Sequence, residues 1–251
     1  MIPRMASPAQ HAIDIRESCG VRTLHFGSEW VQGAMRVARP WHLELEYTRE
    51  MMMPLLLGPR HPERVLLIGL GAASLTRFLH RHCPDTHQTV IECNHQVIAA
   101  ARHFFKLPEN ALHLEVIHAD GADFMATCPQ QYDVILVDGF DEKGRAGALE
   151  SEAFYQRCRA RLSDNGILTI NLLGKNRGFR GTLKRLQQAF VPPICVLPPC
   201  PDGNVIAMAS PASFPPPDMP SLRKLATELK RDTGLNLFPT LSRWEARASD
   251  S

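Results

Sequence analysis

Two carboxylates stand at the end of an apolar segment near the middle of the chain. The segment Tyr132–Gly144, YDVILVDGFDEKG, runs through four apolar residues into Asp138, and Asp141 follows three residues later. In an open α/β sheet, ligands bind beyond the carboxyl ends of the strands. A carboxylate at such a position can accept a proton from a reacting group. The structural alternative is that Asp138 caps a local turn through an Asx hydrogen bond.

A glycine-containing turn and a further acid indicate what lies opposite these carboxylates. In GLGAAS, Gly69–Ser74, the residues Gly69 and Gly71 let the backbone approach a ligand, and the following helix offers free N–H groups. Glu92 ends the next strand, where a carboxylate can accept both hydroxyls of a ribose. These features also suit an NAD enzyme, and the turn by itself could be a tight turn without a ligand.

The residues at a third strand end help to distinguish a site for one nucleoside from a site for a dinucleotide. HADGADF places Asp120 and Gly121 at that end, where a carboxylate suits the exocyclic amine of adenine. A dinucleotide would need a second nucleotide-binding half, for which the chain is short, and Ser74 stands where a third glycine would be. The residues therefore favour an adenosyl-sulfur cofactor.

The elements that must position these residues alternate between apolar strands and helical segments. Five strands are predicted, at 64–71, 89–93, 114–120, 132–140 and 167–173. Five helices are predicted, at 73–82, 95–105, 121–127, 151–163 and 179–190. Near-continuous apolar strands indicate a parallel sheet that is covered on both faces. Segments 193–199 and 204–210 flank a CPDG turn and are expected to pair antiparallel. By analogy of architecture, this is an α/β class I S-adenosylmethionine-methyltransferase-like Rossmann fold.

The two ends of the chain have a different character. Residues 12–58 contain three short strand-like runs, which predict a small N-terminal β-meander, followed by a helix over 41–58. A proline-rich linker, 213–220, leads to a helix at 221–234 with a solvated charged face. We therefore divide the chain into an N-terminal β region with a connecting helix (1–58), a Rossmann domain (59–212), and a linker with a C-terminal helix (213–251).

The amino-acid composition bears on which partners, compartments and metals are expected. The net charge is +2 and no Lys/Arg run occurs, so nucleic acid is not expected. The N-terminus lacks the apolar core of a secretory signal, and the apolar run Met51–Gly58 is too short to span a bilayer. Seven cysteines without a CxxC pair fit free thiols in a reducing cytoplasm. The histidines are not at ligand spacing, so no metal is expected.

The motifs together resemble the polyamine aminopropyltransferase family, the spermidine synthases, from about Ile13 to Ser210. The family's catalytic loop is an Asp, two small residues, an Asp, then Pro-x-Gly-Pro-Ala; here it is DGFDEKGRAGAL, in which Asp138 and Asp141 match the two acids. Four other segments resemble the family's in the right order: IECNHQVI, HADGADFM, SEAFYQRCRARLSDNGIL and CPDGNVIAM.

The resemblance implies a role for each matching residue. Asp138 would help to deprotonate an attacking amine, and both acids would hold its cationic nitrogens. Glu92 would bind the ribose, and Asp120 with Gly121 the adenine. Glu50, retained from the family's Tyr-His-Glu-Met motif, would bind substrate. The co-substrate would be decarboxylated S-adenosylmethionine or S-adenosylmethionine itself, the acceptor a small amine such as putrescine, and the protein a homodimer in the cytoplasm.

The sequence departs from the family at several positions, among them Asn94, which replaces a second acid after Glu92. Ala72 stands where the family's GGGDGG turn has the Asp that holds the terminal amine of the cofactor, and Thr48 and Arg49 replace Tyr and His of the Tyr-His-Glu-Met motif. The first hypothesis is aminopropyl transfer to a polyamine. Ala72 and Arg49 motivate the second, an S-adenosylmethionine-dependent methyltransferase. The third is a non-catalytic nucleoside-binding relative.

Overall fold

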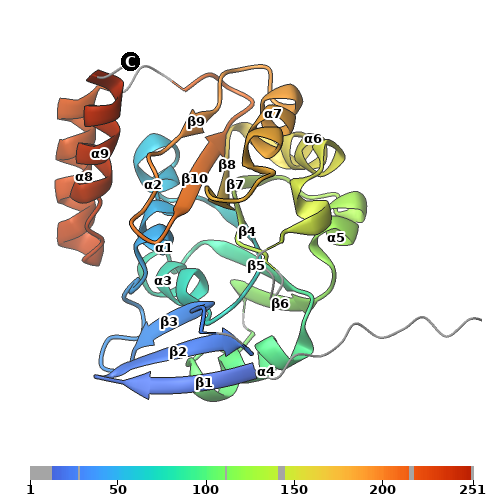
Figure 1. Ribbon diagram of the computed structural model, residues 1–251, viewed down its shortest axis with the longest axis vertical. Coiled ribbons are helices and arrows are strands. Elements are labelled where there is room, and N and C mark those ends of the chain that lie inside the picture. Colours follow the sequence, from blue (N-terminus) through green and yellow to red (C-terminus); the bar gives the residue numbers. More distant parts are fainter. Residues whose placement is uncertain (1–12, 28, 111, 141–144, 215–217, 250–251) are drawn as a thin grey trace, which may run out of the picture.

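A seven-stranded sheet forms the centre of the computed structural model, which describes residues 13–27, 29–110, 112–140, 145–214 and 218–249 (Figure 1). The strand order is β6-β5-β4-β7-β8-β10-β9. The strands are β4 Arg64–Ile68, β5 His87–Glu92, β6 Leu114–His118, β7 Tyr132–Val137, β8 Leu162–Leu173, β9 Cys195–Val196 and β10 Asn204–Ala209. Strands β4 to β8 pair in parallel, whereas β10 is antiparallel to both β8 and β9. The predicted fold class and terminal hairpin are confirmed.

Helices cover both faces of this sheet, as the apolar strands require. The helices α5 Gly121–Thr127, α6 Glu152–Arg161 and α7 Phe179–Ala189 lie on one side (Figure 1). The helices α3 Ser74–His82 and α4 His95–Phe104 contribute to the cluster on the other face. Alternate residues of β4 belong to the two clusters, Val65 and Leu67 to one and Leu66 and Ile68 to the other. This two-sided burial explains the continuous apolar runs.

The N-terminal region is the predicted antiparallel meander. It consists of β1 Ile13–Ser18, β2 Val21–Phe26 and β3 Gly33–Arg36, and it lies at one end of the molecule (Figure 1). Leu24 and Met35 of this small sheet share a buried cluster with Ala72 and Phe105. The meander is therefore packed directly on the turn that follows β4.

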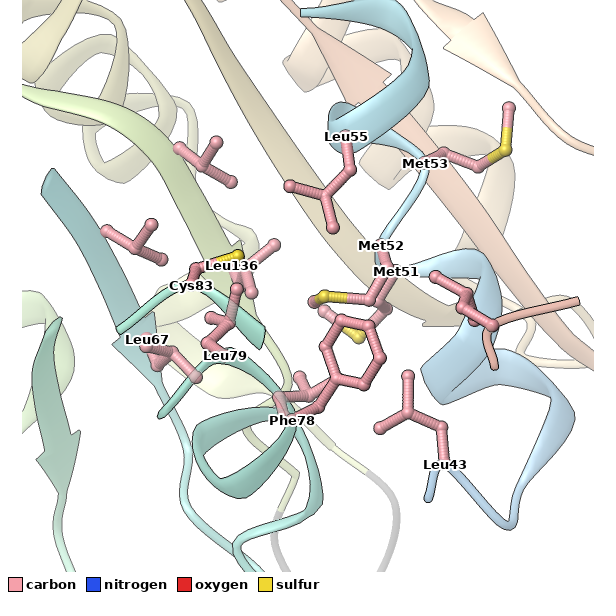
Figure 2. Close-up of a cluster of buried hydrophobic side chains, with 14 of the residues drawn as sticks. Leu43, Met51, Met52, Met53, Leu55, Leu67, Phe78, Leu79, Cys83 and Leu136 are labelled. Atoms are coloured by element: carbon pink, nitrogen blue, oxygen red, sulfur yellow. The ribbon is translucent and has the colours of Figure 1, made fainter. Parts of the chain in front are cut away.

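The predicted helix over 41–58 is wrong in extent. The structure has two short helices, α1 Glu46–Glu50 and α2 Pro54–Leu57. Pro54 has no N–H and its ring conflicts with the carbonyl four residues earlier, so a proline favours the first turn of a new helix. The connecting methionines are fully buried, and Met51 and Met52 point toward Phe78 of α3 (Figure 2).

A second boundary also differs from the prediction. Helix α6 ends at Arg161, and Leu162, which belongs to the helix predicted at 151–163, is already extended and begins β8. The register between β7 and β8 shifts between Tyr132 and Val134, so the Asn165–Gly166 pair lies inside an irregular strand. Residues 163–166 therefore lie opposite the single residue 133 of β7.

The C-terminal part contains one more helix than predicted. Helix α8, Met219–Thr233, is followed by α9, Phe238–Ser249, and the two lie side by side (Figure 1). Helix α8 is not simply solvated, because Leu222, Ala226 and Leu229 are buried at helical spacing. Within the described part of the chain, no helix is both long and apolar enough to cross a membrane.

Candidate active site at the carboxyl edge of the sheet

The turn after β4 and the end of β7 touch one another. The N–H of Asp138 donates to the carbonyl of Ile68, and the N–H of Gly69 donates to the carbonyl of Ile91. Gly69 has φ +100°, and a Cβ there would overlap the carbonyl oxygen of Asp138. Only glycine fits this position. The structure thus brings together Gly69 and Asp138, which are far apart in the sequence.

Both carboxylate oxygens of Asp138 accept hydrogen bonds from other elements. The hydroxyl of Tyr47 in α1 donates to Oδ2 at 3.2 Å, and Nδ2 of Asn171 in β8 donates to Oδ1 at 2.9 Å. Burial raises the pKa of Asp138 above its ordinary value, while these two hydrogen bonds oppose the rise and the charge of Glu92 adds to it. The result is an oriented carboxylate that binds a proton more readily than an exposed aspartate.

The orientation of Asn171 is itself fixed. Nδ2 of Asn204 in β10 donates to Oδ1 of Asn171 at 2.9 Å, so the amide nitrogen of Asn171 is the group that faces Asp138. Sequence reasoning missed Tyr47, Asn171 and Asn204. A signal existed for Asn171, because it is a polar residue in the apolar run ILTINLL and is only 4% exposed.

Glu92 lies at the end of β5 beside the glycine turn, as predicted. Its Oε2 accepts the N–H of Leu70 at 2.9 Å, and its Oε1 accepts the N–H of Asn94 at 2.9 Å. Burial raises the pKa of Glu92, and hydrogen bonds from backbone N–H groups, including that of Gly71, oppose the rise. A carboxylate held in this way presents acceptor oxygens at the strand edge, where a diol could bind.

The N-terminal meander covers the glycine turn. A Cβ at Gly71, where φ is +49°, would lie 3.3 Å from the carbonyl oxygen of Gln32. A Cβ at Gly33 would lie 2.6 Å from the Cβ of Ala72, which is 2% exposed. The side chain at position 72, where the family has an acid, therefore faces the small sheet.

Asp120 and Gly121 are at the same edge of the sheet. Oδ1 of Asp120 caps α5 by accepting the N–H groups of Ala122 and Asp123, at 2.8 and 3.0 Å, and the residue stays exposed. A Cβ at Gly121 would overlap Cγ2 of Ile68, so glycine is needed here for α5 to pack on β4. Asp120 therefore lies just beyond β6, the strand next to β5, which ends in Glu92.

Glu50 is not brought to this edge by its side chain. Its carboxylate is fully buried and accepts hydrogen bonds from Cys200 at 3.0 Å and Thr240 at 3.2 Å, and it pairs with Arg243. Asp141, the other predicted amine ligand, lies outside the described residues.

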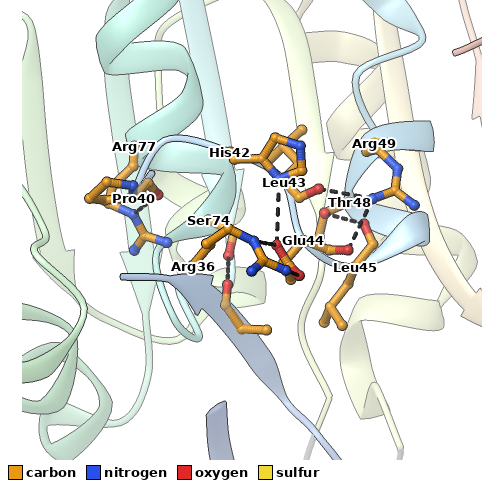
Figure 3. Close-up of polar contacts among 11 residues, drawn as sticks. Arg36, Pro40, His42, Leu43, Glu44, Leu45, Thr48, Arg49, Ser74 and Arg77 are labelled. Atoms are coloured by element: carbon orange, nitrogen blue, oxygen red, sulfur yellow. Dashed lines mark hydrogen bonds and ion pairs between the residues drawn. The ribbon is translucent and has the colours of Figure 1, made fainter. Parts of the chain in front are cut away.

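The residues that replace the family's Tyr and His have local roles. Thr48 donates to the carbonyl of Leu45, and Nη1 of Arg49 donates to the carbonyls of Leu43 and Glu44 (Figure 3). The guanidinium of Arg49 thus holds the backbone that leads into α1.

The assembled groups can bind a polar ligand and accept a proton. Within the described ranges, no group of three or more His, Cys, Asp and Glu residues could hold a metal ion. The edge offers carboxylate oxygens at Glu92 and Asp120 for a polar nucleoside, and one oriented carboxylate, Asp138, as a proton acceptor.

Comparisons with known proteins identify the family of the chain. Residues 44–198 match the family model of the spermine/spermidine synthase domain. A polyamine aminopropyltransferase of Neisseria meningitidis serogroup A is 37% identical over 230 residues, which cover 92% of this chain and 88% of the relative.

Two solved structures show the fold. A probable spermidine synthase from Corynebacterium glutamicum has a TM-score of 0.73 at 19% identity, with 92% of this chain and 88% of that chain covered. A spermidine synthase in complex with the transition-state analogue AdoDATO has a TM-score of 0.68 at 22% identity, with 93% and 85% covered. With the family model and the identity to the bacterial enzyme, these findings show that the chain belongs to the spermine/spermidine synthase family and is a transferase.

Proposed function

We propose that this protein transfers the aminopropyl group of decarboxylated S-adenosylmethionine to a small amine such as putrescine. The amine nitrogen attacks the carbon beside the sulfonium. The new C–N bond forms as the C–S bond breaks, and the electron pair of that bond stays on sulfur, which leaves as methylthioadenosine. The amine proton passes to a carboxylate, so atoms and charge balance.

The observation that carries this proposal is the environment of Asp138. A free alkyl amine has a pKa of about 10, like that of lysine, so it is protonated near pH 7 and must lose a proton before it attacks. Burial makes Asp138 a better proton acceptor than an exposed aspartate, and Tyr47 and Asn171 hold its two oxygens in place. Such a positioned base contributes roughly 10²–10⁴-fold to a rate.

The nucleoside end of the donor would lie along the strand ends of β4, β5 and β6. Glu92 would accept the ribose hydroxyls and Asp120 the adenine amine, while Gly69 and Gly71 let the chain come close. Because Gly69 contacts Asp138, the proposed proton acceptor would lie beside this turn. Asp141 would hold the distal cationic nitrogen of the amine.

The choice of donor rests on the analogue complex of the related fold. AdoDATO is bound by a spermidine synthase that this chain resembles over most of its length. In this chain, Ala72 occupies the position of the family's acid that holds the donor's amine. Its methyl group is buried against Gly33. The donor's terminal amine would therefore be held by other groups than in the family motif.

The decisive experiment is a reaction panel. The enzyme is incubated with decarboxylated or ordinary S-adenosylmethionine and a set of diamines and polyamines, and products are identified by mass spectrometry. We expect an aminopropylated amine and methylthioadenosine only with the decarboxylated donor, and product formation slowed roughly 10²–10⁴-fold in Asp138→Asn. Methyl transfer from the ordinary donor, or binding of neither donor by calorimetry, would contradict the proposal. Light scattering on the same preparation tests the homodimer that the resemblance implies.

A further inference from the structure

The C-terminal helix α9 contacts the helix that supplies Tyr47 to the site. Helix α9 lies beyond residues 44–198, which match the family model. Arg243 of α9 nevertheless reaches α1: Nη1 pairs with Glu46 at 2.6 Å, and Nη2 pairs with Glu50. Glu46 and Glu50 are four residues apart and so lie on one side of α1. One guanidinium therefore holds both ends of this short helix.

The pair with Glu50 is a buried one. Glu50 is 0% exposed, and Thr240, also on α9, donates a second hydrogen bond to it. A buried carboxylate is tolerated only where donors compensate for lost hydration, and removal of one partner from such a pair is strongly unfavourable. The contact between α9 and Glu50 is thus a requirement for α1 to pack where it does.

Helix α1 depends on such external support. It has five residues, and its N-cap residue, Leu45, makes no side-chain capping hydrogen bond. A helix of this length is not stable by itself in water. Tyr47 lies between the two glutamates in sequence, and its hydroxyl reaches Asp138. The same helix therefore carries the ion pairs to α9 and the donor to the proposed base.

We propose that Arg243 is a positioning residue: by binding Glu46 and Glu50 it holds α1 so that Tyr47 donates to Asp138. Glu50 then serves as the docking point for α9 instead of as an amine ligand. The catalytic consequence rests on the proposed function, whereas the effect on α1 does not.

The effect should be visible in the pH dependence of turnover. In the described part of the chain, three side chains influence the pKa of Asp138: Tyr47 from α1 and Asn171 from β8 through hydrogen bonds, and Glu92 from β5 through its charge. The pKa of Tyr47 is raised well above its usual value, so the hydroxyl stays protonated and remains a donor. Loss of this donor raises the pKa of Asp138, and because the base acts when ionised, the acid limb of kcat moves to higher pH.

Arg243→Met is compared with Arg223→Met, which removes a different ion pair, the one between Arg223 of α8 and Glu245 of α9. We expect Arg243→Met to lower kcat by about 5- to 10-fold, the usual effect of one lost hydrogen bond. We also expect it to shift the acid limb upward and to leave methylthioadenosine affinity within about 2-fold. Arg223→Met should match wild type. An unchanged pH profile in folded Arg243→Met would overturn the proposal.

Two further measurements test whether Arg243 acts through Tyr47 and through the stability of α1. In a Tyr47→Phe background, Arg243→Met should have little further effect on the acid limb, since both changes act on one contact; independent, additive shifts would refute the mechanism. Hydrogen–deuterium exchange of residues 45–53 should rise in Arg243→Met, and absence of this rise also refutes it. This exchange needs no turnover, so an inactive wild-type enzyme would count against the proposed function alone.

Discussion

The two halves of the candidate site are built in different ways. In the nucleoside half, every residue lies at or just beyond the carboxyl end of a parallel strand: Gly69 follows β4, Glu92 is the last residue of β5, and Asp120 lies two residues after β6. In the amine half, Asp138 is also a strand-end residue, but its partners Tyr47 and Asn171 come from a short helix and from the interior of β8.

The side chains of the two halves are therefore positioned by two different features of the structure. Parallel strands bring their carboxyl ends to one edge, so strand-end residues are gathered by the fold itself. The groups that orient Asp138 are instead set by helix placement and by register, and small displacements there change the hydrogen bonds without changing the fold. The nucleoside half should therefore be robust to remote substitutions, and the amine half sensitive to them.

The largest expected effect comes from removing the charge in the amine half. In Asp138→Asn, the amide oxygen can still accept from Asn171 and the amide nitrogen can donate to the Tyr47 oxygen, so the geometry is retained. We expect kcat to fall roughly 10²–10⁴-fold. Calorimetry should show methylthioadenosine affinity within about 2-fold of wild type. An equal loss of binding and turnover would place Asp138 in the nucleoside half.

The matching change in the nucleoside half is Glu92→Gln. It removes the charge and turns one of the two acceptor oxygens into an NH2 donor, which faces a backbone N–H of Leu70 or Asn94. A hydrogen bond to a charged group is worth roughly 1.5–3 kcal/mol. We expect methylthioadenosine to bind about 10–100-fold more weakly, measured by calorimetry, with a smaller change in kcat at saturation. Glu115→Gln, on an exposed position of β6, is the control and should bind normally. Unchanged affinity in Glu92→Gln would remove Glu92 from the site.

A third change tests the cover over the glycine turn. In Gly33→Ala the new methyl group would lie 2.6 Å from the Cβ of Ala72, so one of two buried segments must move. Overpacking of this kind costs about 1–3 kcal/mol of unfolding free energy, measured by urea denaturation. Gly178→Ala, with open space around it and φ −82°, should change stability by less than about 0.5 kcal/mol. Equal stabilities would mean that the meander does not press on the turn.

The smallest effect is expected for Tyr47→Phe. The lost hydroxyl removes one hydrogen bond from Asp138, so kcat should fall about 5- to 10-fold. Because that bond lowers the pKa of Asp138, its loss should move the acid limb of the kcat profile to higher pH. Turnover is then lost at a higher pH as the solution is acidified. A profile that keeps its wild-type position would show that Tyr47 does not act through Asp138.

Much of the framework could be predicted from local patterns. The apolar runs that end in Glu92, Asp120 and Asp138 gave the strands, and the order of motifs gave the family. The errors fell where tertiary contacts decide. Pro54 begins a new helix within the predicted one, and Leu162 is in a strand because it pairs with Tyr132 of β7. The buried side of α8 and the presence of α9 were missed because, besides contacting one another, α8 packs on α2 and α9 pairs with Glu50, both far away in sequence.

The sequence by itself determined which residues reach the carboxyl edge of the sheet, because strand ends and glycine turns follow from local hydrophobic and conformational preferences. Only the tertiary structure decided how Asp138 is oriented and where Glu50 points. The first outcome depends on the contacts of Asp138 with residues 47 and 171, and the second on the contact of Glu50 with residue 243; no local pattern encodes pairings over such separations. For the same reason, the missing acid at Ala72 became interpretable only when its methyl group was seen packed against Gly33.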